Sequence, residues 1–229
     1  MAVVYAARDT VRDTPVAIKV LRDELTKILG PQRFLREIEI ASRLSHPAIV
    51  PVIDSGQAAG SLYYVMPFIE GETLRARLKR ETQLPLDDAL RITREVAKAL
   101  TYVHANQVVH RDIKPENILL SGNQVVLADF GIARVLGNVD QETLSTTGLA
   151  IGTPTYMSPE QAAASQNIDS RSDIYSLGCV LSRCWRESRR SPGRRRRRSR
   201  RGISPSHRGQ FGLYDQPHLR PCRSRSRRH

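Results

Sequence analysis

Short apolar runs alternate with turn-forming residues in the first part of the chain. Residues 2–6 (AVVYA) and 15–21 (PVAIKVL) are rich in β-branched and apolar side chains, and turn formers separate them. This pattern predicts two strands joined as a hairpin. In the second run Ala17 and Lys19 are two positions apart, so both side chains are expected on one face of the strand. Two further apolar runs predict two more strands, at residues 48–56 and 61–69.

Helical periodicity follows from Pro31, a residue suited to a first helical turn. One stripe of this helix is expected to contain Glu37, Ala41 and Leu44. A longer helix is predicted after Pro85, with acidic residues at its start and a buried face made of Ile92, Val96, Ala99 and Val103. A strand-rich front followed by a helical rear predicts an α+β fold in two lobes.

The charge of the chain is concentrated at its end. Residues 182–229 contain 17 arginines, no lysine and two acids, a net charge of +15. The 19 basic and 21 acidic residues before them give −2. No apolar run is long enough to span a bilayer, so we expect a cytoplasmic protein with no membrane segment. The three cysteines fit neither a metal-ligand pattern nor a disulfide framework.

Four short motifs occur in a fixed order along residues 1–181. They are VAIK at 16–19, VHRDIKPENILL at 109–120, DFG at 129–131, and GTPTYMSPE at 152–160. Each is weak alone, but together they resemble the protein kinase signature set. The sequence around these motifs is most similar to bacterial, eukaryotic-like (Hanks-type) serine/threonine kinases. The resemblance implies a bilobal kinase fold, with an N-lobe and hinge over 1–69 and a partial C-lobe over 70–181.

The resemblance implies a site for ATP and Mg²⁺, with Mn²⁺ as an alternative metal. Lys19 would hold the α- and β-phosphates, oriented by an ion pair with Glu37. Asp129 and Asn117 would hold the metal ions.

The same resemblance assigns the transfer chemistry to the catalytic loop. Asp112 would accept the proton of the substrate hydroxyl, and Lys114 would neutralise the γ-phosphate. A lysine at this position is typical of kinases that act on protein serine and threonine.

Apolar residues would enclose the adenine. The resemblance places Val4 and Ala17 above the base, Leu119 below it, and Met66 at the back of the pocket. Phe68 belongs to the hinge at residues 67–69. Ordinary core packing is the alternative interpretation of these positions.

Regulation is implied by Arg111, which precedes Asp112. Kinases with this arginine order their activation loop through a phosphate. Candidate phosphosites are Ser145, Thr146 and Thr147, modified in trans by a second copy, and Thr153 would hydrogen-bond near the catalytic loop. A merely polar loop is the alternative.

The chain departs from the family pattern at both ends. Met1 stands where the family's glycine-rich loop has just ended, so either translation starts late or the true start lies upstream. After residue 181 the composition becomes arginine-rich and of low complexity, and we interpret residues 182–229 as an out-of-frame, disordered tail, with a genuine basic extension as the alternative. Asp173 would still brace the catalytic loop, whereas Glu160, if buried without its family partner, would cost about 3–5 kcal/mol. We therefore expect marginal stability and impaired activity.

Two other functions compete with an active kinase. A pseudokinase scaffold or inactive remnant would bind partners without catalysis, but the side chains needed for catalysis are all present. The basic tail could bind nucleic acid non-specifically, although its aromatics show no stacking pattern, so no specific nucleic-acid partner is expected.

Overall fold

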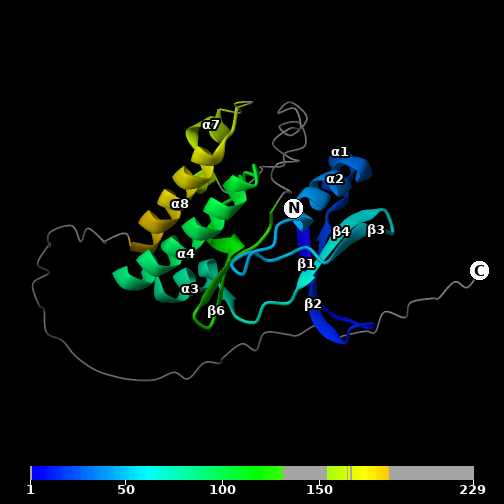
Figure 1. Cartoon of the computed structure of the whole chain (residues 1–229), viewed down its shortest axis with the longest axis horizontal. Helices are drawn as coiled ribbons and strands as arrows, with labels where there is room; N and C mark the ends of the chain where they lie inside the picture. Colours follow the sequence, from blue (N-terminus) through cyan, green and yellow to red (C-terminus); the bar gives the residue numbers. More distant parts are fainter. Residues whose placement is uncertain (1, 131–153, 164, 166, 186–229) are drawn as a thin grey trace, which may run out of the picture. The chain divides into compact units, whose positions relative to one another are not determined.

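A computed structural model describes residues 2–130, 154–163, 165 and 167–185. The first part of the chain forms a four-stranded sheet with the strand order β1-β2-β4-β3. The strands are β1 (Ala2–Asp9), β2 (Thr14–Leu21), β3 (Asp54–Ala58) and β4 (Ser61–Pro67). All three pairings are antiparallel, and Figure 1 shows the sheet on the right. The predicted hairpin is confirmed, with a tighter turn than expected because its strands extend to Asp9 and Thr14.

Two helices pack on this sheet. They are α1 (Asp23–Leu29), for which no helix was predicted, and α2 (Pro31–Ser42), which begins at the predicted proline. Phe34 and Ile38 of α2 pack against the sheet residues Leu21, Leu62 and Tyr64. These contacts bury one face of α2 and fix it against β2 and β4.

The predicted strand at residues 48–56 is largely wrong. In the structure β3 begins only at Asp54, and before it Ile49 forms one isolated parallel bridge to Leu127. The intervening apolar residues join the two lobes: Val50 donates its N–H to the Leu127 carbonyl at 2.9 Å. Burial of Ile49 and Val50 explains the apolar start of this segment, whereas Ile53 at its end is 41% exposed.

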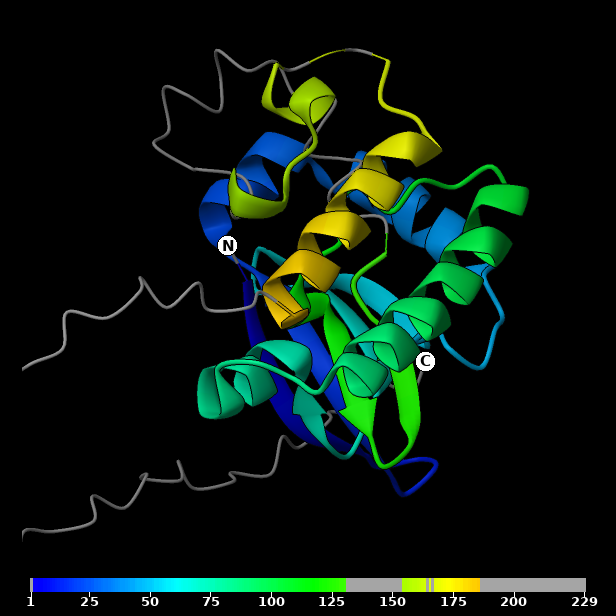
Figure 2. The ribbon, with the colours of Figure 1, turned by 90° about the vertical axis from the view of Figure 1, so that its left-hand side faces the viewer.

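The rear part is mainly helical. It contains α3 (Leu74–Glu81), α4 (Leu86–Ala105), α7 (Pro159–Ala162) and α8 (Ser170–Trp185), with short 3-10 turns at Pro115–Asn117 and Pro154–Tyr156. The long helix predicted after Pro85 is confirmed, and its four predicted apolar residues are all buried. Helices α4 and α8 lie side by side in both views (Figures 1 and 2).

A small antiparallel sheet carries the loops that hold the candidate site. Its strands are β5 (Glu72–Thr73), β6 (Ile118–Ser121) and β7 (Gln124–Leu127), in that order. Ile118 pairs with Leu127, so the residues just before β6 and just after β7 lie next to each other. The α+β class predicted from the sequence is therefore confirmed.

Helix α8 continues beyond the predicted boundary at residue 181. Cys184 lies in its last turn, is 1% exposed, and packs in the core of the rear part. Its carbonyl accepts a hydrogen bond from the Leu84 N–H at 3.0 Å, which ties the end of α8 to the connection between α3 and α4. Among the described residues, none of the helices combines the length and the apolar character that crossing a membrane requires.

Candidate active site

A charged cluster on one face of the four-stranded sheet consists of Lys19, Tyr64 and Asp129. Lys19 on β2 pairs in register with Tyr64 on β4, so the two side chains are neighbours on one face. The Lys19 Nζ lies 2.6 Å from Asp129 Oδ2, and the Tyr64 hydroxyl donates to Asp129 Oδ1 at 2.6 Å. Two strands therefore fix one carboxylate.

Electrostatics keep Asp129 ionised. Burial alone would raise the pKa of this carboxyl, but the charge and hydrogen bond of Lys19, together with the Tyr64 hydroxyl, outweigh that effect and lower it. Burial and the neighbouring anion raise the pKa of Tyr64 well above its ordinary value. The cluster thus presents a carboxylate that accepts hydrogen bonds from an ammonium and a neutral phenol.

Asp112, Lys114 and Asn117 form a second cluster in the loop before β6. The Lys114 Nζ lies 2.7 Å from Asp112 Oδ2. Asn117 donates its Nδ2 to the Asp112 carbonyl at 2.8 Å and to Oδ2 at 3.0 Å. Asn117 is buried, whereas the other two side chains remain partly accessible, so the cluster is supported from inside and open to a substrate.

A buried aspartate on α8 braces this loop. Asp173 is fully buried and accepts hydrogen bonds from the backbone N–H groups of His110 at 2.9 Å and Arg111 at 2.7 Å. His104 on α4 contacts the same carboxylate at 2.8 Å. The predicted bracing role of Asp173 is therefore confirmed by these contacts. Arg111 has a φ of 65°, a strained conformation that such contacts stabilise.

The main chain of one residue, Ala128, joins the two clusters. Ala128 donates its N–H to the Asn117 carbonyl at 2.9 Å, and its own carbonyl lies 3.0 Å from His110 Nε2. A carbonyl only accepts, so Nε2 must carry the proton, and Nδ1 then accepts the Asp112 N–H at 3.2 Å. The His110 ring therefore connects the loop of Asp112 to the residue that precedes Asp129.

The predicted adenine residues fall into two groups. Ala17 pairs in register with Met66, and both Met66 and Leu119 pack against the small cluster of Val50, Val126 and Ala128. The structure therefore brings Met66 and Leu119 together. Val4, on the edge strand β1, is 56% exposed and pairs with Lys19.

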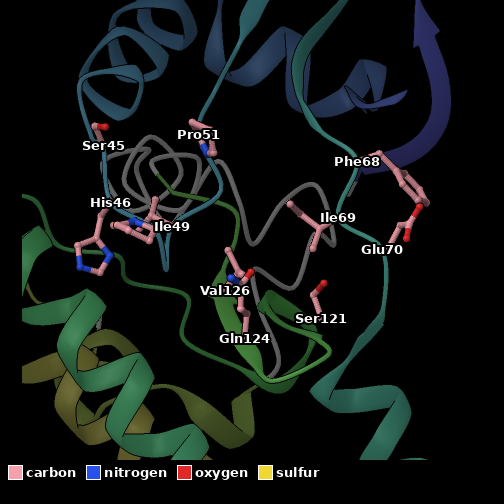
Figure 3. Close-up of a pocket in the computed structure, with 11 residues that line it drawn as sticks. Ser45, His46, Ile49, Pro51, Phe68, Ile69, Glu70, Ser121, Gln124 and Val126 are labelled. Carbon is pink, nitrogen blue, oxygen red and sulfur yellow. The ribbon is translucent and has the colours of Figure 1, made fainter. Parts of the chain in front are cut away.

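Phe68 lines an open pocket. It is 43% exposed and borders an open pocket of about 570 Å³, in which Figure 3 shows it with Glu70 on one side and Ser45 and His46 on the other. The pocket is bounded by neither Lys19 nor Asp129. We therefore do not assign this pocket to the charged site.

Several predicted residues keep the status of predictions. Glu37 lies on α2 and is partly buried, but the ion pair that the described residues show for Lys19 is with Asp129. Outside the described residues lie the predicted phosphosites Ser145, Thr146 and Thr147, the loop threonine Thr153 with its predicted hydrogen bond, and residues 186–229 of the tail predicted at 182–229.

The carboxylate of Glu160 is not buried, in contrast to the case considered from the sequence. It is exposed on α7, and hydrogen bonds from its own N–H and from the Ser158 side chain lower its pKa. The conditional cost of 3–5 kcal/mol for a buried, unpaired carboxylate therefore does not apply. Ser158 and Gln161 instead form a capping box at the start of α7. Gln161 also donates to the Arg111 carbonyl at 2.6 Å, a second support of the catalytic loop.

Comparison with known families agrees with this geometry. The sequence pattern described as "Protein kinase domain" matches residues 1–205. The chain belongs to the protein kinase family.

Bacterial serine/threonine kinases are among the relatives of this kinase chain. PknB from Mycobacterium leprae is 43% identical over 189 residues, which are 79% of this chain and 30% of that protein. The probable serine/threonine-protein kinase SCO3848 from Streptomyces coelicolor is 44% identical over 187 residues, 79% of this chain and 28% of that protein. The chain thus spans less than a third of the length of these relatives.

Solved kinase structures share the fold. The kinase domain of PknI from Mycobacterium tuberculosis aligns with a TM-score of 0.66 and 31% identity, covering 81% of this chain and 68% of that one. Rad53 in complex with AMP-PNP aligns with a TM-score of 0.61 and 26% identity, covering 80% of this chain and 44% of that one. These likenesses confirm both the predicted kinase fold and the predicted resemblance to bacterial serine/threonine kinases.

Proposed function

We propose that this kinase chain transfers the γ-phosphate of ATP to serine and threonine hydroxyls of proteins. The observation that carries the proposal is the double link through Ala128, which holds the Asp112 cluster and Asp129 in one unit. Phosphoryl transfer depends on positioning and charge neutralisation, so a rigid link between the hydroxyl-activating group and the metal-binding group is what the reaction requires.

The donor set fits magnesium. Mg²⁺ prefers oxygen ligands, and Asp129 offers an ionised carboxylate. Asn117 donates through its Nδ2 to Asp112, so its amide oxygen is the atom through which it would hold a metal ion. Mg²⁺-ATP supplies the phosphoryl group and neutralises its charge when bound; Mn²⁺ would be an alternative metal.

The remaining residues act on the protein substrate and on the phosphates. Asp112 orients the incoming hydroxyl and accepts its proton. Lys114 lies 2.7 Å from Asp112 and would shift toward the transferred phosphate, where its positive charge offsets the negative charge of that group. Lys19, between the sheet and Asp129, holds the other phosphates.

The test is transfer of radiolabelled phosphate from Mg²⁺-ATP to a basic protein by the full chain, followed by phosphoamino-acid analysis. Asp112→Asn and Lys19→Met are expected to abolish transfer. Asp87→Asn and Lys79→Met, which change exposed residues on α4 and α3, are matched controls. Transfer that survives both site substitutions would contradict the proposal. Nucleotide binding without transfer in the unmodified chain would instead favour a pseudokinase.

We also propose that activation proceeds in trans at Ser145, Thr146 or Thr147. Phosphate on this loop would pair with Arg111, whose backbone is held by Asp173. The rate of autophosphorylation per molecule should then rise with protein concentration. A rate per molecule that is independent of concentration would indicate modification within one chain.

A further inference from the structure

Tyr64 was not anticipated as a site residue, yet it contacts Asp129. Side chains alternate along β4, so that Leu62 and Tyr64 are buried on one face of the sheet. The Tyr63 side chain instead lies by Gly56 of β3, where an added Cβ would come within 2.9 Å of its hydroxyl oxygen. Of two adjacent tyrosines, one therefore faces the charged cluster and the other faces away.

The hydroxyl of Tyr64 completes the support of the Asp129 carboxylate. Lys19 holds Oδ2 and Tyr64 holds Oδ1, each at 2.6 Å. A single donor would leave the carboxylate free to rotate about the bond to its Cβ, whereas donors on both oxygens, from two adjacent strands, fix its plane. Lys19 is held as well, because its Nζ lies 5.9 Å from the centre of the Tyr64 ring.

Asp129 needs this support because its backbone is strained. Its φ is 67°, in the left-handed region that residues other than glycine rarely adopt. Each carboxylate oxygen has two lone pairs, and the contacts with Lys19 and Tyr64 use one on each oxygen. Among the described residues, these two contacts leave one lone pair on each oxygen for a metal ion in a fixed direction.

We propose that Tyr64 is a positioning residue for the metal-binding carboxylate of Asp129. The inference rests on the proposed function, since it assigns to Tyr64 the orientation of the group that would hold Mg²⁺. Hydrogen-bond partners of metal ligands typically contribute about 10- to 100-fold to metal affinity. Tyr64→Phe removes the hydroxyl and keeps the ring in the core, so it should weaken metal binding while preserving the fold.

The experiment measures ADP binding by calorimetry with and without Mg²⁺, and Mn²⁺ binding by electron paramagnetic resonance. In the unmodified chain Mg²⁺ should tighten ADP binding. In Tyr64→Phe this tightening should fall by about tenfold, with a matching loss of Mn²⁺ affinity. ADP affinity without metal should not change. Tyr63→Phe removes the same hydroxyl from the neighbouring residue and should behave like the unmodified chain.

The outcomes separate the inference from the proposed function. If Mg²⁺ does not affect ADP binding in the unmodified chain, the proposed function itself fails. If it does, an unchanged or stronger metal effect in Tyr64→Phe overturns the inference, as does an equal loss of ADP affinity with and without metal. Thermal melting checks folding, and Tyr64→Leu, which also lacks the hydroxyl, should show the same metal defect.

Discussion

Asp173→Asn should weaken both the fold and the catalytic loop. Asp173 is fully buried and accepts the N–H groups of His110 and Arg111, one on each carboxylate oxygen. An asparagine side chain has one oxygen, and its NH₂ group would face a backbone N–H that can only donate. The contact with His104 also changes from a carboxylate to a neutral amide.

The magnitude follows from these contacts. One buried N–H without an acceptor costs about 1–3 kcal/mol, and replacing a charged acceptor by a neutral one weakens the remaining bond by about 1 kcal/mol. We therefore expect the free energy of unfolding to fall by about 2–4 kcal/mol, a large part of a typical total of about 5–15 kcal/mol. Because Arg111 directly precedes Asp112, turnover should also fall by about tenfold or more through misplacement of the catalytic carboxylate.

Urea denaturation followed by circular dichroism measures the first effect, and phosphate transfer from Mg²⁺-ATP measures the second. Asp87→Asn is the matched control: this exposed aspartate in the first turn of α4 should contribute only about 0.3–1 kcal/mol. A free energy of unfolding within about 0.5 kcal/mol of the unmodified chain would refute the bracing role of Asp173.

Two further predictions concern positions away from the site. Gly71→Ala should lower the free energy of unfolding by at least about 2 kcal/mol, because φ is 138° and the new Cβ would lie 2.1 Å from the Leu120 carbonyl oxygen. The control Gly122→Ala, at a residue with φ of 55° and open space around it, should lower the free energy of unfolding by only about 1 kcal/mol in the same urea titration. Equal losses in the two variants would contradict the predicted clash at Gly71. Burial raises the pKa of Cys184 from 9.0 to about 11, so the unfolded chain loses this proton first and stability should fall as pH rises from about 9 to 11, by about 1–2 kcal/mol. Cys184→Ala should lack this component, and identical pH profiles would show that another group is responsible.

The sequence alone predicted those helices and strands whose spacing of apolar residues matches the face that the structure buries. The long helix α4 was recognisable because its apolar residues recur with helical spacing and all contact one core. Residues 48–53 have the composition of a strand but link the two lobes, and the polar segment DSGQA forms β3 because Val65 and its neighbours on β4 provide pairing partners. Such outcomes depend on tertiary pairing, which local composition does not encode.

Among the site residues, too, some could be predicted from the sequence and one depends on tertiary pairing. Lys19, Asp112, Asn117 and Asp129 could be found because they occur in ordered motifs whose chemistry is recognisable in the sequence. Tyr64 could not, because two tyrosines stand side by side and only the register of β2 against β4 determines which one faces Lys19. Alternation along the strand offered a signal, since Leu62, Tyr64 and Met66 share one period, but nothing in the sequence places Asp129 opposite that face.

The link through Ala128 has a consequence for how this region tolerates substitution. Both hydrogen bonds use main-chain atoms of Ala128, so exchange of the Ala128 side chain leaves them in place as long as the replacement fits the space and the His110 ring, the partner in one of them, is kept. Proline is the exception, because it has no N–H to give. The coupling between the two loops thus depends partly on main-chain atoms, which substitutions at residue 128 other than proline do not remove.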